Sequence, residues 1–118
     1  MSFTAGRERQ EKTDVIEKYF DCVISGRIDE LPVTDDYGSE SPSSGLVQGP
    51  EAVAYLGRIG AEMSAIRVVQ HVVEGNFVAT HFEEDIDGGT VPVFALFELA
   101  GEKVRFVRVF FDRGAPGA

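Results

Sequence analysis

The chain has 118 residues, a formal net charge of −9 and 43% apolar residues, which fits one soluble domain with a single core. The negative charge argues against nucleic acid or an anionic membrane surface as a partner, because both would repel it. No stretch approaches the roughly 18 apolar residues of a membrane span. The only cysteine, Cys22, cannot form an internal disulfide, so we expect a cytoplasmic protein.

The start of the chain predicts helices. We expect a charged N-terminal segment over residues 1–13, a single domain over 14–113 and a frayed tail over 114–118. From Val15 to Ile24 apolar residues recur at helical spacing. This helix begins with a capping pair at Asp14 or extends upstream through the charged residues 7–12, and Gly26 ends it. Residues 28–31 then suit one further helical turn.

The next segment predicts a connection followed by a second helix. Residues 34–49 are rich in Ser, Gly, Asp and Pro. Because so long a structureless loop is uncommon in a small domain, we expect a short edge strand near residues 37–41. Proline is favoured at the first helical position, so Pro50 marks the start of a helix. Its buried face is predicted to contain Val53, Leu56, Ile59 and Met63.

The second half of the chain predicts four β-strands. The runs are residues 65–73, 77–84, 90–99 and 103–111, separated by glycine-bearing turns at 74–76, 87–89 and 100–102. Turns this short can join only antiparallel neighbours, since parallel strands need a crossover of a dozen or more residues. The sequence therefore predicts an antiparallel meander.

Two of these strands are apolar on both faces. In the third run, Phe94 and Leu96 lie opposite a face formed by Val91, Val93, Ala95, Phe97 and Leu99. In the fourth, Phe106 and Phe110 lie opposite Val107, Val109 and Phe111. An antiparallel sheet with one solvated face is polar on that face. Two short helices cover only one side, so we expect a homodimer formed through the sheet.

The order of elements resembles the NTF2-like superfamily, in its branch of SnoaL-like polyketide cyclases and ketosteroid isomerases. The resemblance rests on Ser39-Glu40-Ser41-Pro42, on the segment from Gly45 to Val53 that opens a helix, and on the last strand from Val107 to Asp112. It implies an α+β, cystatin-like, cone-shaped fold in which a curved, mostly antiparallel sheet packs on N-terminal helices. It also implies an apolar pocket and dimers formed through the sheet.

Most catalytic residues of the enzymes in this superfamily have no counterpart in this chain. Tyr19 corresponds to the tyrosine with which ketosteroid isomerases donate a hydrogen bond to the substrate oxygen. Ser41 stands where those enzymes have their general base. The positions of other acids in relatives correspond to Val93, Ala95 and Val109, which are apolar. These replacements favour binding over catalysis.

Three hypotheses follow. In the first, the pocket binds a small apolar molecule without a cofactor, and it is lined by Tyr19, Phe20, Tyr37, Ser41, Tyr55, Val93, Ala95, Phe97, Val107, Val109 and Phe111. In the second, the protein is a cofactor-independent isomerase, cyclase or hydrolase that uses Tyr19 with Glu40 or Glu84 for proton transfer. In the third, the pocket is closed and the protein is a structural or interaction module.

The remaining polar residues give weak signals. His71 and His81 are expected on neighbouring strands, where they could meet across the ladder. A metal pair with Glu83 or Asp85 would lack a third fixed ligand, so we expect no metal site. Glu40 and Glu84 also fit as solvated strand residues. Arg105 fits as a surface partner of Glu102.

Overall fold

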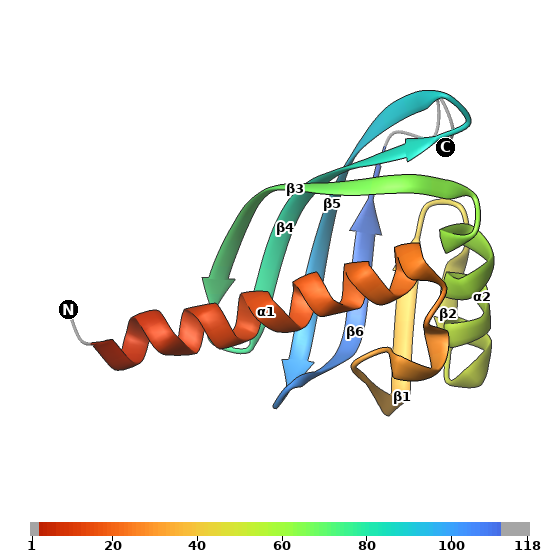
Figure 1. Ribbon diagram of the computed structural model, residues 1–118. Helices are drawn as coiled ribbons and strands as arrows, with labels where there is room; N and C mark the ends of the chain where they lie inside the picture. The colour runs from red at the N-terminus through yellow and green to blue at the C-terminus, as the bar shows by residue number, and fades with distance from the viewer. Residues whose placement is uncertain (1–2, 112–118) are drawn as a thin grey trace.

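The computed structural model describes residues 3–111, which form two α-helices, a 3-10 turn and one six-stranded sheet (Figure 1). The helices are α1 (Phe3–Ser25) and α2 (Pro50–Gly60), and the 3-10 turn covers Ile28–Glu30. The strands are β1 (Val33–Ser41), β2 (Gly45–Gln48), β3 (Met63–Glu74), β4 (Phe77–Ile86), β5 (Gly89–Ala100) and β6 (Lys103–Phe110). The predicted tail, residues 114–118, lies outside the described residues.

Strands β3 to β6 form the predicted meander. Each pairs antiparallel with the next, and every strand end lies within two residues of its prediction. At the turn between β4 and β5, Asp87 and Gly88 have φ values of 50° and 76°. Two successive left-handed residues give a tight hairpin turn, and an Asp-Gly pair adopts that conformation readily. The turn chemistry therefore accounts for the success of this prediction.

The connection over residues 34–49 contains more structure than its composition predicts. The expected short strand is longer, Val33–Ser41, and it turns back into β2. The sheet order is β2-β1-β6-β5-β4-β3, and β1 runs parallel to β6. Strand β1 is therefore an interior strand, and the prediction of an edge strand was wrong because the four-residue β2 carries no clear apolar alternation.

The two helices differ from prediction at their ends. Helix α1 begins at Phe3, so the upstream extension is correct and Asp14 is not its start. In α2 the buried residues are Ala52, Leu56 and Gly60, whereas Val53 and Ile59 are only partly buried. Met63 opens β3 rather than ending α2. Gly60 is buried because α2 crosses α1 closely at Val23.

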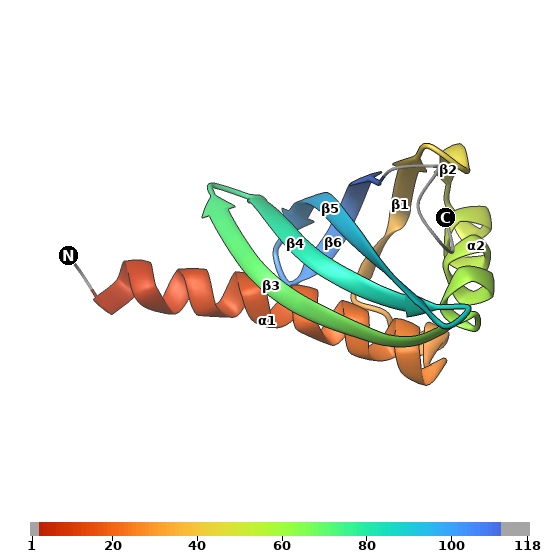
Figure 2. The ribbon, with the colours of Figure 1, turned by 90° about the horizontal axis from the view of Figure 1, so that it is seen from above.

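The sheet curves around α1, and the core lies between them. Figure 2 shows the strands bending over the helix, with α2 standing at one end of the sheet. Val91, Val93, Ala95, Phe97 and Leu99 of β5 are all buried on the inner face, as their alternation predicts. Within residues 3–111, neither helix is long and apolar enough to cross a membrane.

The outer face of the sheet carries exposed apolar side chains, which agrees with the two-faced pattern in the sequence. Phe94 of β5 and Phe110 of β6 are directly opposite each other, and 54% and 57% of their surfaces are exposed. Val72 of β3 and Phe77 of β4 extend the exposed apolar surface. His81 stacks on Phe94 with parallel rings whose centroids are 5.1 Å apart. We refer to Val69, Val72, Phe77, Phe94 and Phe110 as the outer patch.

His71 and His81 do not meet across the ladder. A register shift in β3 pairs His81 with Gln70 and places His71 opposite Thr80. His71 Nδ1 lies 2.8 Å from Thr80 Oγ1 under α1, while His81 lies on the outer face beside Phe94. Among residues 3–111 no group of three His, Cys, Asp or Glu side chains could hold a metal.

Arg105 has a different partner from the predicted one. Its guanidinium lies 3.6 Å from the carboxylate of Asp36 on β1, and not beside Glu102. The parallel pairing of β1 with β6 brings these two strands together. The sequence predicts neither that pairing nor this contact, because the two residues are far apart in the chain.

Candidate functional site

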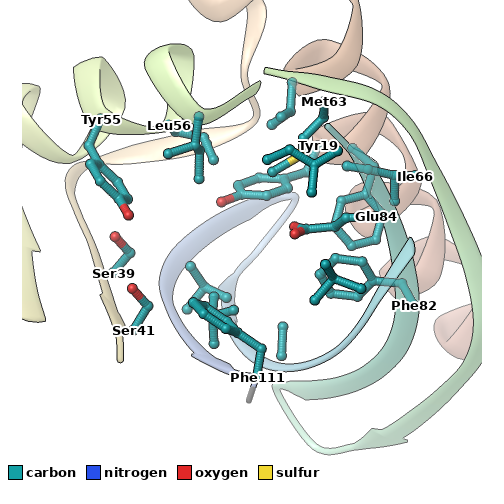
Figure 3. A pocket seen from close by; sticks show the side chains of 18 of the residues that line it. Tyr19, Ser39, Ser41, Tyr55, Leu56, Met63, Ile66, Phe82, Glu84 and Phe111 are labelled. Carbon is teal, nitrogen blue, oxygen red and sulfur yellow. The ribbon is translucent and has the colours of Figure 1, made fainter. Parts of the chain in front are cut away.

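A cavity of about 210 Å³ lies between the inner face of the sheet and the two helices (Figure 3). Most of its wall is apolar: Phe20, Val23, Leu56, Ile59, Met63, Ile66, Phe82, Ile86, Val91, Ala95, Phe97, Val107, Val109 and Phe111. The polar residues of the wall are Tyr19, Tyr37, Ser39, Ser41, Ser43, Tyr55, Glu62 and Glu84. An apolar cavity with a few polar groups is typical of a site for a small molecule.

Two tyrosines form a buried hydrogen-bonded pair at the wall of the cavity. The hydroxyl oxygens of Tyr19 on α1 and Tyr37 on β1 are 2.5 Å apart, and one donates to the other. Tyr19 belongs to the apolar stripe of α1, and its ring packs edge-on against Phe97 at a centroid distance of 5.3 Å. Burial raises the pKa of Tyr19 well above its usual value and that of Tyr37 to about 12. Both phenols are therefore neutral at physiological pH.

Further hydroxyl groups come from β1, the following turn and α2. Ser39 and Ser41 share the inner face of β1, because side chains two residues apart in a strand point the same way. Ser41 Oγ accepts a hydrogen bond from the backbone N–H of Ser44 at 3.1 Å. Ser43 Oγ lies 3.3 Å from the Tyr55 hydroxyl. Figure 3 shows the hydroxyl groups of Ser39, Ser41 and Tyr55 together on one side of the cavity.

Glu84 lies on the other side of the cavity, and its carboxylate points into it (Figure 3). It shares the inner face of β4 with Phe82 and Ile86, both of which are buried. No hydrogen bond or ion pair joins this carboxylate to another of residues 3–111. Burial alone raises the pKa of Glu84 to about 7, because the charged form loses its hydration without gaining a partner.

No basic side chain balances Glu84 within the wall. The lining residues include two carboxylates, Glu84 and Glu62, and no Lys, Arg or His. Glu62 is exposed, since it follows α2 at the rim. Among the described residues, Glu84 is therefore the one lining carboxylate that is largely withdrawn from solvent and faces an apolar interior.

Most of the predicted pocket residues do line the cavity. The structure brings together Tyr19, Phe20, Tyr37, Ser41, Tyr55, Glu84, Ala95, Phe97, Val107, Val109 and Phe111. Val93 is buried on the same face of β5 but is not part of the cavity wall. Ala95 and Val109 also line the cavity. They are the apolar residues at positions where the resemblance implies acids in other NTF2-like proteins.

The structure does not bring Glu40 into this site. Its neighbours Ser39 and Ser41 point inward, so Glu40 points to the outer face. There its carboxylate lies 3.3 Å from the guanidinium of Arg108. With Glu40 on the opposite side of the sheet, Glu84 is the one predicted catalytic carboxylate that lines the cavity together with Tyr19.

Several lining residues were not predicted. Ser39 is missed because the start and register of β1 are obscure in a polar segment. Met63 is missed because β3 begins two residues before the predicted strand. Ile66 lies within the predicted strand, but the sequence does not assign it to the inner face. Phe82 and Ile86 alternate with Glu84 along β4. That alternation is a signal in the sequence that these three residues share one face.

Comparisons by sequence identify no relatives. No protein-family model matches the chain, and none of the curated proteins matches it. Solved structures do match. One is an NTF2-like protein of unknown function from Burkholderia xenovorans LB400, with a TM-score of 0.75 and 19% identity over 92% of this chain and 90% of that chain.

Two further matches are described by an activity. A candidate SnoaL-like polyketide cyclase from Jannaschia sp. CCS1 has a TM-score of 0.73 and 21% identity over 87% of this chain and 86% of that chain. The epoxide hydrolase/cyclase-like enzyme SalBIII has a TM-score of 0.76 and 18% identity over 89% of this chain and 93% of that chain. The chain thus has the α+β NTF2-like fold that its resemblance implies, and identities this low show the fold alone.

Proposed function

We propose that this protein binds a small, mostly apolar molecule in the cavity. The observation that carries the proposal is the cavity itself, an apolar space with hydroxyl groups on one side and a single inward carboxylate on the other. Its volume of about 210 Å³ is below the roughly 300–1,000 Å³ of pockets for drug-sized ligands. The occupant we propose is therefore smaller than a drug-sized molecule. An open interior favours this function over a closed structural module.

The apolar wall favours binding over the chemistry of the implied family. Ser41 and Ala95 line the cavity at positions that correspond to a general base and an acid in ketosteroid isomerases. A serine hydroxyl is too weak a base to remove a proton from carbon unaided, and alanine has no proton to donate. The family's usual reaction therefore finds no support in these residues.

A second candidate function is proton transfer by Glu84, and the raised pKa of this carboxyl favours it. A carboxylate with a pKa of about 7 is well matched to accept a proton at neutral pH. It would take the proton from a carbon next to a carbonyl group, while Tyr19 donates a hydrogen bond to the oxygen that gains charge. Exchange of the α-protons of a small ketone such as phenylacetone for solvent deuterium, abolished by Glu84→Gln, would support this candidate. Exchange at the uncatalysed rate with the unmodified protein would contradict it.

The binding proposal is tested by filling the cavity. Ala95→Leu adds three carbons to a lining residue of β5, and Ala100→Leu makes the same change at an exposed position of the same strand. With 2-phenylethanol as probe, calorimetry should show affinity lost in Ala95→Leu and kept in Ala100→Leu. Equal affinity in both variants would contradict binding in the cavity. Circular dichroism checks that both variants remain folded.

We also propose that a second copy of the chain covers the outer patch. The patch is apolar, exposed and placed on strands β3 to β6. A two-fold axis through such a patch would bury the same residues from both copies, as in most homodimers. This arrangement leaves the cavity free, because the cavity lies on the opposite face of the sheet.

A further inference from the structure

The carboxylate of Glu84 has no positively charged partner inside the cavity. When its carboxyl group is ionised, its charge faces an apolar interior with no cationic side chain in the wall. A charge held in such surroundings is costly unless an opposite charge is close to it. Within residues 3–111 the protein supplies none, so a bound molecule is the available source of a counter-charge.

Aromatic side chains line the same cavity as Glu84. Tyr19, Phe20, Phe82, Phe97 and Phe111 all line the cavity, and the first four form one packed cluster, with Phe20 and Phe82 centroids 4.6 Å apart. The faces of aromatic rings carry partial negative charge and attract cations. A cation bound in this cavity would therefore share it with several aromatic rings as well as with Glu84.

The hydroxyl groups at the cavity are uncharged and can form hydrogen bonds with a bound molecule. Tyr19 on α1, Tyr37 on β1 and Tyr55 on α2 are the phenols at the cavity, while β5 and β6 add no titratable group to its wall. Because burial raises the pKa of Tyr19 and of Tyr37, these two are neutral and can accept a hydrogen bond from an N–H group. The net charge of −9 also favours the approach of a cation.

We propose that the molecule bound in the cavity is a small amine with an apolar body, whose ammonium group pairs with the carboxylate of Glu84. This inference rests on the proposed binding function and adds the chemical class of the ligand. The ammonium would lie between Glu84 and the aromatic rings, and the apolar body would contact Val107, Val109 and Phe111.

A neutral ligand makes the opposite prediction. Glu84 can donate a hydrogen bond to a carbonyl or hydroxyl oxygen only in its protonated form. Binding of a neutral ligand that only accepts hydrogen bonds, such as a ketone, would weaken as the pH rises through 7, and Glu84→Gln would preserve it. Binding of an amine requires the ionised form and would strengthen over the same range. The direction of the pH dependence therefore distinguishes the two ligands.

The experiment compares three probes with similar bodies: 2-phenylethylamine, 2-phenylethanol and 3-phenylpropionate. Calorimetry at constant ionic strength should show that the amine binds the tightest at pH 8. Its affinity should fall by about tenfold between pH 8 and pH 6, because the ionised fraction of a group with a pKa of about 7 falls by that factor. An affinity for the amine that rises as the pH falls would overturn the proposal.

Matched variants separate Glu84 from its neighbours. Glu84→Gln should reduce amine binding by at least about tenfold and leave 2-phenylethanol binding almost unchanged. Glu83→Gln, on the outer face beside Arg67, should change neither. Loss of amine binding in Glu62→Gln alone would overturn the assignment to Glu84. Removing an unpaired charge should not impair folding, and circular dichroism verifies this.

The outcomes also separate this inference from the binding function. If 2-phenylethanol binds in the cavity and the amine binds no more tightly, the ammonium site is wrong while the binding function stands. If none of the three probes binds, both proposals are contradicted.

Discussion

The hydroxyl oxygens of Tyr19 and Tyr37 lie 2.5 Å apart in the core, where they join α1 to β1. Each hydroxyl satisfies the other, so neither is left buried without a partner. The contact also fixes where the helix lies over the sheet beside the cavity. A polar pair thus positions one wall of an otherwise apolar site.

Removing either hydroxyl should destabilise the fold through the one that remains. We expect Tyr19→Phe and Tyr37→Phe each to lower the free energy of unfolding by about 1–3 kcal/mol, because each leaves a buried hydroxyl unpaired. The double variant should lose less than the sum of the two by about 1 kcal/mol. Urea titrations of the four proteins measure this, and strict additivity would show that the two hydroxyl groups do not interact.

Glu84 should make stability depend on pH. Its pKa rises from 4.5 to about 7 on folding, so the folded state holds this proton more tightly than the unfolded chain. The resulting stabilisation is complete below pH 4.5 and is lost as the pH rises through 7. We expect the wild type to lose about 3 kcal/mol across this window relative to Glu84→Gln.

Urea titrations at several pH values measure that difference. The control is Glu83→Gln, which changes the neighbouring carboxylate on the outer face of β4 and should follow the wild-type profile. Parallel profiles for the wild type and Glu84→Gln would mean that Glu84 is not buried as described.

The contact between α1 and α2 should tolerate no side chain at position 60. A Cβ on Gly60 would lie 2.8 Å from both the Cγ1 and the carbonyl oxygen of Val23, and the backbone cannot move away without separating the helices. We expect Gly60→Ala to cost about 1–3 kcal/mol. At Gly57, a Cβ would meet Ile28 Cγ1 at an ordinary 3.4 Å, so Gly57→Ala should be neutral or stabilising by up to about 1 kcal/mol. Thermal unfolding of both variants compares them, and equal losses would contradict the close helix contact.

A charge in the outer patch should separate the proposed dimer. Phe94 is 54% exposed and pairs across strands with Phe110, so Phe94→Glu would bury a carboxylate in an apolar interface. Sedimentation velocity should show a dimer for the wild type at micromolar concentration and a monomer for the variant. Ser25→Glu, which adds the same charge at the exposed end of α1, should remain a dimer. A monomeric wild type would contradict the proposal.

The sequence predicts the meander well because its signals are local. Short turns such as Asp87-Gly88 join strands that are adjacent in the chain, and alternation along β5 identifies its inner face. The polar strand β1 gives no such alternation. Its place between β2 and β6 depends on parallel pairing with a strand more than 60 residues away, which no local pattern encodes.

The same limit applies to the candidate site. Shifting a strand's register by one residue exchanges its two faces, which is why Glu40 and Glu84 were equal candidates. The fold places Glu40 outside beside Arg108 and Glu84 inside. The alternation of Glu84 with Phe82 and Ile86 pointed to this result, but the neighbouring Glu83 and Asp85 made the segment look solvated. His71 and His81 were misplaced for a similar reason, because the register shift in β3 is invisible in the sequence.

The most direct test of the central claim, that the cavity binds a small molecule, is an isotope-filtered NOE measurement with 2-phenylethylamine or 2-phenylethanol, whichever binds more tightly. Val107 and Val109 line the cavity, whereas Val69 and Val72 belong to the exposed outer patch. We predict NOEs from the phenyl protons of the probe to the methyl groups of Val107 and Val109. NOEs to Val69 and Val72 instead, or to no methyl group on the inner face, would contradict the account.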